Sequence, residues 1–205
     1  NESAKMGFAE GIRSMMRQDP DIILVGEIRD QETAEMAFAA AMTGHQVYST
    51  LHTNSAIGAI PRLLDIGVLP DIMSGNIIGI IAQRLVRKLC PHCREAHLAD
   101  DIERQLLGLG EDAPPQTLYR AVGCDRCAHQ GYKGRIAIIE LLKMTPALDE
   151  LVARRVSSRE LKTAAAAGGF HSLIDDGVRR VLEGVTTLEE VGRVVDLTER
   201  LGRLH

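Results

Sequence analysis

Aromatic residues are scarce in this chain: its 205 residues include three Phe, three Tyr and no Trp. Proteins that bind single-stranded nucleic acid stack bases on aromatic side chains, so this composition argues against that class. Basic residues do not dominate either, because 24 Lys and Arg oppose 28 Asp and Glu and leave a net charge of -4. We therefore expect no electrostatic attraction toward nucleic acid or anionic lipid.

Two further absences narrow the classes of protein. No stretch reaches the roughly 18 consecutive apolar residues of a membrane-spanning helix, so we expect a soluble chain without direct membrane insertion. No Gly-Lys pair occurs anywhere, so the glycine-rich GxxxxGK[ST] loop that holds the phosphates of ATP is missing. The N-terminus carries neither an initiator Met nor a signal sequence, which predicts a chain cut from a longer one.

The residues that are present predict an α/β layer followed by helices. Residues 21–25 and 46–51 are expected to form strands, the first of them fully buried, and Asp30 is expected to cap a helix over residues 31–42. Asn54 and Ser55 are expected to cap another helix, and a further one should run from Pro70 to about Lys88. From about Pro146 we expect a small helical bundle, with helix starts of the capping-box type at Ser157 with Glu160, Ser172 with Asp175, and Thr187 with Glu190.

The cysteines form two pairs of identical spacing. Cys90 and Cys93 are separated by two residues, as are Cys124 and Cys127, and thirty residues lie between the pairs. Two such CxxC turns can bring four thiolates to one tetrahedral zinc ion, and a shell closed by four sulfurs would be structural. The alternatives are two disulfides or reactive redox pairs, and a site in which His92, His97 or His129 replaces one cysteine.

An acidic residue follows the first predicted strand. Glu27 comes after Gly26, which places its carboxylate at the C-terminal edge of the strand, where α/β proteins bind ligands. Such a carboxylate can hold magnesium through water or orient the attacking water in phosphoryl transfer. The alternative is an acidic residue that ends a strand without a catalytic role.

Two histidines flank the second predicted strand. His45 precedes this strand, and His52 follows it at the edge where Glu27 should project. A sensor of the γ-phosphate needs a hydrogen-bond donor there, and a histidine can supply one. The alternative is that His52 caps the following helix or is an ordinary edge residue.

The combined motifs resemble the secretion ATPase family, the hexameric motors of type II secretion and type IV pilus assembly. The resemblance covers nearly the whole chain and depends on six segments, the last of which is the paired CxxC: residues 17–21, 25–30, 43–45, 49–54, 82–85 and 90–127. The tetracysteine segment, with residues 131–135 behind it, is similar to the secretion and pilus-extension branch of the family.

The resemblance implies a role for each candidate residue. Glu27 matches the Walker B glutamate, His45 and His52 match the histidine box, with His52 as the phosphate contact, and Cys90, Cys93, Cys124 and Cys127 match the zinc ligands. Arg13 and Arg17 match arginines ahead of the Walker B strand, and their spacing of four puts both on one helical face. Arg135 is a third candidate for the set near the nucleotide. The alternative for all three arginines is a solvated or salt-bridged surface.

The same resemblance implies the organisation and the partners. Residues 1–88 would be the C-terminal half of a RecA-like P-loop NTPase core, 89–143 the tetracysteine zinc module and 144–205 a helical subdomain. ATP and Mg²⁺ would be cofactors of the complete protein, while this chain alone would be inactive without the phosphate loop. The partners would be neighbouring subunits of a homohexamer and the inner-membrane platform and cytoplasmic-domain proteins of the machine, which would keep the motor cytoplasmic and peripheral to the inner membrane.

The alternative function is a non-catalytic zinc-ribbon interaction module, with nucleic acid as one ligand. The net charge, the few aromatics and the lack of a clustered basic face argue against it. Residues 84–88 are the only short basic run, and the solvated end of a helix would explain them.

Overall fold

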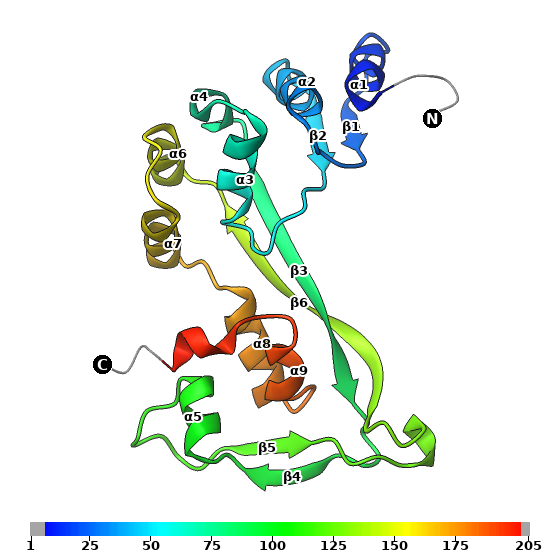
Figure 1. Ribbon diagram of the computed structural model, residues 1–205, viewed down its shortest axis with the longest axis vertical. Coiled ribbons are helices and arrows are strands. Elements are labelled where there is room, and N and C mark those ends of the chain that lie inside the picture. Colours follow the sequence, from blue (N-terminus) through cyan, green and yellow to red (C-terminus); the bar gives the residue numbers. More distant parts are fainter. Residues whose placement is uncertain (1–6, 202–205) are drawn as a thin grey trace. The chain divides into compact units, whose positions relative to one another are not determined.

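The structure, a computed structural model, describes residues 7–201 and has a mixed α/β architecture, as the sequence predicts (Figure 1). The chain divides into two compact units. Unit 1 comprises Asn1–Ile81 and Leu141–Phe170, and unit 2 comprises Ala82–Glu140 and His171–His205. Within residues 7–201, no helix has the length and hydrophobicity needed to cross a membrane.

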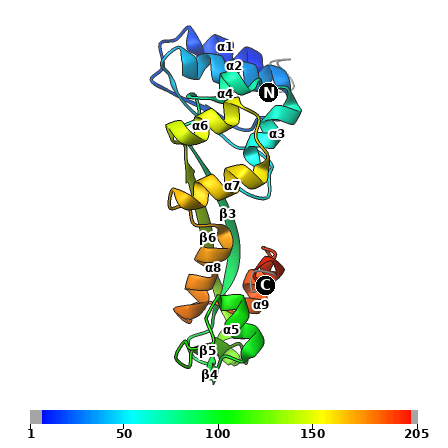
Figure 2. The ribbon, with the colours of Figure 1, turned by 90° about the vertical axis from the view of Figure 1, so that its left-hand side faces the viewer.

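Unit 1 is built around a short parallel strand pair. Strand β1 (Ile22–Val25) pairs with β2 (Gln46–Ser49), with Ile22 opposite Gln46 and Val25 opposite Ser49. Helices α1 (Phe8–Met16) and α2 (Gln31–Met42) lie side by side (Figures 1 and 2), and they contact β1 and β2, respectively. The core of this region is small and aliphatic, and its buried members are Ile12, Ile23, Val25 and Ala40.

Helix α2 confirms its predicted bounds and its predicted cap. The Asp30 carboxylate accepts a hydrogen bond from the Thr33 N–H at 2.8 Å, which satisfies one of the unpaired donors in the first turn. Alanines make close packing possible, and Ala34 and Ala40 are fully buried. The chain leaves the helix through Gly44, whose φ of +98° favours glycine, and enters β2 two residues later.

One face of the strand pair is exposed, which corrects the expectation of a fully buried strand. Ile23 and Val25 are buried, but Ile22 is 60% exposed and Leu24 is 72% exposed. Tyr48 of β2 is also exposed. Parallel sheets are normally covered on both faces, so this apolar face lacks the layer that the residue types predict.

The region after β2 differs most from the prediction. Helix α3 (Ala59–Ile66) begins after Gly58, and no side chain caps it; Ser55 instead accepts from the Gly58 N–H in the preceding turn. Helix α4 (Pro70–Met73) lasts only one turn, and strand β3 (Gly79–Leu89) occupies the place of the predicted helix to Lys88. Gly75 leaves the helix with a φ of +76°. Burial then alternates along β3, because Ile81 and Leu85 are exposed whereas Val86 is buried, and this period of two belongs to a strand.

Helices α6 (Pro146–Ala153) and α7 (Ser158–Ala167) complete unit 1. Asp149 of α6 holds the residues that follow α4 through two hydrogen bonds. Its carboxylate accepts from the Gly75 N–H at 3.0 Å, and its backbone carbonyl accepts from the Ser74 hydroxyl at 3.1 Å. The predicted cap of α7 is confirmed, since Ser157 and Glu160 bond reciprocally.

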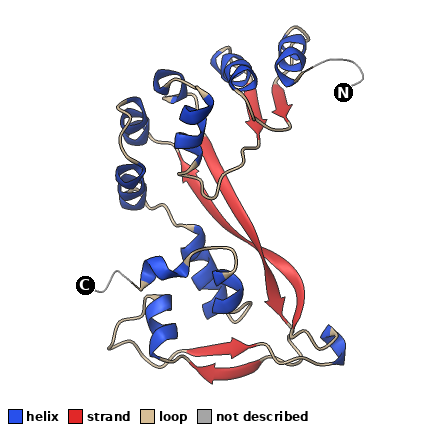
Figure 3. Cartoon of the chain, viewed as in Figure 1, coloured by secondary structure: helices blue, strands red, loops and turns tan. Residues whose placement is uncertain are grey.

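Unit 2 combines strands with the remaining helices (Figure 3). Strand β3 pairs with β6 (Tyr132–Lys143), and both strands contribute residues to each unit. Strands β4 (Glu95–Leu98) and β5 (Thr117–Arg120) form an antiparallel pair, with α5 (Asp101–Leu107) between them in the chain. The other elements of unit 2 are α8 (Leu173–Leu182), α9 (Leu188–Gly192) and the short 3-10 helices η2 (Asp125–Cys127) and η3 (Leu197–Arg200).

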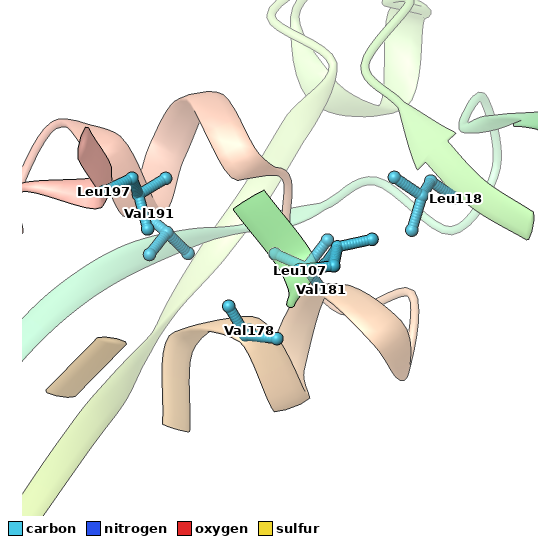
Figure 4. Packing of buried hydrophobic residues seen from close by; sticks show 6 residues of the cluster. All are labelled: Leu107, Leu118, Val178, Val181, Val191 and Leu197. Atoms are coloured by element: carbon cyan, nitrogen blue, oxygen red, sulfur yellow. The ribbon is translucent and has the colours of Figure 1, made fainter. Parts of the chain in front are cut away.

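Unit 2 has its own hydrophobic core (Figure 4). Six buried side chains from five elements meet in it: Leu107, Leu118, Val178, Val181, Val191 and Leu197. Because α5, β5, α8, α9 and η3 each contribute, this core joins segments that are far apart in the sequence. A second cluster of Val86, Ile138 and Leu173 fixes α8 against β3 and β6.

The predicted helix starts of the C-terminal part are confirmed. Ser172 and Asp175 make the reciprocal capping bonds, while Thr187 accepts from the Glu190 N–H without a reciprocal bond. Helices α6 and α7 belong to unit 1, and α8 and α9 belong to unit 2. The division into the parts 1–88, 89–143 and 144–205 stays a prediction.

Candidate functional site

Glu27 lies where β1 ends. Since β1 and β2 are parallel and Val25 is opposite Ser49, the segments that follow both strands emerge at the same edge of the pair. Two hydrogen bonds hold these segments together: the Ile28 N–H donates to the Thr50 carbonyl at 2.9 Å, and the Thr50 side-chain hydroxyl donates to the Gly26 carbonyl at 2.6 Å. The backbone on either side of Glu27 is thus fixed to the segment that carries His52.

Glu27 and His52 meet at this edge. The His52 Nε2 atom is 3.2 Å from Glu27 Oε2, and the Arg29 Nε atom is 2.6 Å from the same oxygen. The Glu27 side chain is only 20% exposed, whereas His52 is 83% exposed. The hydrogen bond from Arg29 is the main cause that lowers the pKa of the Glu27 carboxyl, with His52 adding to it and burial opposing it. An ionised carboxylate at a strand end, next to an exposed imidazole, can accept a proton or orient a water molecule.

His45 does not join this pair. It precedes β2, so the length of the strand separates it from the edge where Glu27 lies. Its Nδ1 atom is 3.0 Å from the Ala40 carbonyl and 3.1 Å from the Thr43 hydroxyl. The ring therefore caps the C-terminal turn of α2.

The three predicted arginines lie in different elements. Arg13 is exposed on α1 and contacts the Met36 sulfur at 3.7 Å, and Arg17 follows α1 directly. Arg135 lies on β6 in unit 2, where it is exposed. Arg29, which sequence reasoning did not assign, is the arginine that contacts Glu27. The sequence feature that could have identified Arg29 is its position two residues after Glu27.

The four cysteines form a single cluster in unit 2. Their sulfur atoms all lie within 4.8 Å of one another. The distances are 4.0 Å between Cys90 and Cys124, 3.8 Å between Cys93 and Cys127, and 3.8 Å between Cys124 and Cys127. Four sulfurs at about 2.3 Å from a central zinc would be about 3.8 Å apart in a tetrahedron, so the donor set fits this ion. All four cysteines are free, which disagrees with the alternative of two disulfides.

Backbone N–H groups point at the sulfurs. The Gly123 N–H donates to Cys93 at 3.3 Å, and Cys127 accepts from the N–H groups of Cys124 at 3.2 Å and Gly131 at 3.3 Å. Burial opposes ionisation of Cys127, but these donors outweigh it and lower the pKa of its thiol to about 6. Burial raises the pKa of the Cys93 thiol to about 12. These backbone donors therefore favour the thiolate form of Cys127.

None of the histidines near the cluster is among its members in the described chain. Each has another partner within 3.1 Å: His92 with Arg126, His97 with Glu103, and His129 with Asp125. The arrangement therefore favours four sulfur ligands over a mixed set.

The chain is thus an α/β protein with two candidate sites. One is the carboxyl edge of the parallel strand pair, which carries a carboxylate and a histidine. The other is a candidate metal centre formed by four thiols. The family model described as "Type II/IV secretion system protein" matches residues 1–193. The chain belongs to this family.

The relatives are proteins of secretion systems and pilus assembly. The chain is 53% identical over 194 residues to the "Type II secretion system protein E" of Pseudomonas aeruginosa, covering 95% of this chain and 38% of that protein. It is 50% identical over 201 residues to the "Type IV pilus assembly ATPase TfpB" of Acinetobacter baylyi, covering 97% of this chain and 34% of that protein. The chain therefore spans little more than a third of the length of these relatives.

Solved structures show a similar fold. The pilus retraction motor PilT with bound ADP matches 93% of this chain and 44% of its own, with a TM-score of 0.64 and 28% identity. The ATPase DotB of Legionella pneumophila matches 92% of this chain and 42% of its own, with a TM-score of 0.60 and 22% identity, which is a likeness of fold alone.

Proposed function

We propose that this chain is the C-terminal part of a hexameric motor ATPase that couples ATP hydrolysis to the assembly of pilus or pseudopilus subunits and to protein export through the inner membrane. The observation that carries the proposal is the contact between Glu27 and His52 at the carboxyl edge of the parallel strand pair. The names of the relatives, which include a pilus assembly ATPase, support it.

In this proposal Glu27 and His52 serve the reaction directly. The Glu27 carboxylate, kept ionised by Arg29, orients the attacking water or holds Mg²⁺ through water, and the exposed His52 contacts the γ-phosphate. His45 belongs to the same proposal through a different contact, because its ring fixes the end of α2 and hence the start of β2. Arg13, Arg17 and Arg135 would stabilise phosphate charge at a boundary between subunits.

The exposed face of β1 and β2 supports a larger core. We place the chain in the second half of a RecA-like domain, in which Ile22, Leu24 and Tyr48 are covered by a further layer of the longer protein. The phosphate loop for ATP and Mg²⁺ would lie in that same part. The chain alone is then inactive, because it contains no Gly-Lys pair and therefore no phosphate loop whose lysine and backbone amides could hold the phosphates.

The cysteine cluster would bind one structural zinc ion per chain. A closed shell of four sulfurs leaves no position for water, so the ion would stabilise the fold without taking part in the reaction. The partners would be neighbouring motor subunits and the inner-membrane platform and cytoplasmic-domain proteins of the machine, at the cytoplasmic side. No observation favours the alternative of a nucleic-acid-binding zinc ribbon.

The decisive experiment extends the protein upstream through the parent reading frame and measures its ATPase rate. We expect Glu27→Gln to lower the rate by roughly a hundredfold or more, the range for removal of a group that acts on the reacting proton. Glu32→Gln, an exposed carboxylate in the first turn of α2, is the matched control and should leave the rate unchanged. Full activity of Glu27→Gln would refute the role of Glu27, and the absence of an upstream phosphate loop would refute the ATPase assignment.

A further inference from the structure

A buried carboxylate of α9 belongs to the same unit as the cysteine cluster and has no part in the proposed reaction. Glu190 is 4% exposed, and its carboxylate accepts from the Arg87 backbone N–H at 3.0 Å, from the Arg87 guanidinium, and from Arg193 at 3.1 Å. The Thr187 and Glu190 pattern predicts a reciprocal cap of α9. Only one half of it forms, because the carboxylate serves Arg87 instead.

The same segment also holds strand β6. The Tyr132 hydroxyl is 2.9 Å from the Thr187 hydroxyl, and the Arg87 guanidinium lies over the Tyr132 ring at 4.2 Å from its centroid. Arg87, Tyr132, Thr187 and Glu190 therefore form one connected set, the α9 clasp. It joins β3 and β6 to the first turn of α9.

Both strands lead directly to cysteines. Cys90 follows Arg87 by three residues, and its N–H donates to the Gly131 carbonyl at 2.9 Å. Gly131, next to Tyr132, donates its own N–H to the Cys127 sulfur at 3.3 Å. Through these two bonds, one cysteine of each pair is fixed to backbone that the clasp holds.

We propose that the α9 clasp positions the metal site: it holds Cys90 and Cys127 at the separation that a tetrahedral ion requires. The inference builds on the proposed zinc site. Glu190→Gln removes the charge and replaces one of the two acceptor oxygens with an NH₂ group, so one of the two Arg87 donors loses its acceptor. The end of β3 then loosens at Cys90, and the ion dissociates faster while the four thiols remain present.

The test compares zinc-loaded variants of the whole chain. Release of zinc into a chromophoric chelator is expected to be roughly tenfold faster for Glu190→Gln. This factor is the lower end of the range seen when a residue that orients a metal ligand, without binding the metal itself, is replaced. Glu189→Gln, the exposed neighbour in the same helix, is the matched control and should stay within about twofold of the wild type. Loading with Co²⁺ adds a readout of geometry, because the thiolate absorption bands should change in Glu190→Gln and not in Glu189→Gln.

The outcomes separate the two proposals. A wild-type chain that binds no zinc refutes the metal site itself. A wild-type chain that binds one zinc, with Glu190→Gln showing the same release rate and the same Co²⁺ spectrum, refutes the clasp. If Glu190→Gln does not fold, Tyr132→Phe decides, since it removes only the hydroxyl contact to Thr187: faster release supports the clasp, and an unchanged rate refutes it.

Discussion

The two candidate sites differ in how much of their surroundings the chain provides. The Glu27 and His52 edge of unit 1 lies on four-residue strands with one apolar face exposed. The cysteine cluster of unit 2 has all its donor atoms within 4.8 Å, backbone N–H groups aimed at its sulfurs, and a core contributed by five elements. The comparison indicates that a site can form without further parts of the protein when its own unit buries the elements that carry it.

Removal of the metal should affect the two regions most unequally. A structural zinc site contributes on the order of 10 kcal/mol in small domains, so chelation under reducing conditions should abolish hydrogen-exchange protection in β4, β5 and the cysteine turns. The amides of α2 in unit 1 should keep their protection, because Asp30 and the aliphatic core hold that helix. Unchanged protection of β4 and β5 after complete removal of zinc would contradict the expected difference between the two units.

Core substitutions should give the next largest difference. Leu118→Ala removes a side chain that is 2% exposed in unit 2, and we expect the free energy of unfolding to fall by about 2–5 kcal/mol. Leu24→Ser in unit 1 changes a side chain that is 72% exposed, and we expect a change within about 0.5 kcal/mol. Urea unfolding of both variants measures this contrast. Equal losses would mean that the face of β1 is covered within the chain.

Acid should weaken unit 2 through the clasp. The hydrogen bond from Arg87 lowers the pKa of the Glu190 carboxyl below its ordinary value of 4.5, despite opposing burial. The folded state therefore binds this proton less readily than the unfolded chain. The contribution of Glu190 to stability is fully present above pH 4.5 and is lost as the pH falls through the lowered pKa. Melting temperatures between pH 7 and 3 should fall less steeply for Glu190→Gln than for Glu189→Gln; identical slopes would contradict this assignment.

Local patterns in the sequence predicted much of unit 1 and both candidate sites. The helix over residues 31–42 formed with its predicted cap, because Asp30 and a run of alanines act within one helix. The meeting of Glu27 with His52 follows from two parallel strands, each of which ends just before one of these residues. The cysteine cluster follows from the spacing of its two CxxC pairs.

The failures come from contacts that a local pattern does not contain. Strand β3 was predicted as a helix because its Ile, Leu and Val suit both structures, and its partner β6 begins more than forty residues later. Glu190 was assigned to a cap because its acceptor role depends on Arg87, which is 103 residues away in the sequence.

The exposed face of β1 and β2 also governs how this chain behaves in concentrated solution. Three neighbouring apolar side chains on this strand pair attract any similar surface, including that of another copy. Among residues 7–201 no third strand pairs with β1 or β2, so their outer edges offer hydrogen bonds to such a surface. Salts such as sulfate strengthen this attraction, while the modest net charge of -4 opposes it only weakly. The exposed apolar side chains of β1 and β2 therefore affect the solubility of this chain as well as its stability.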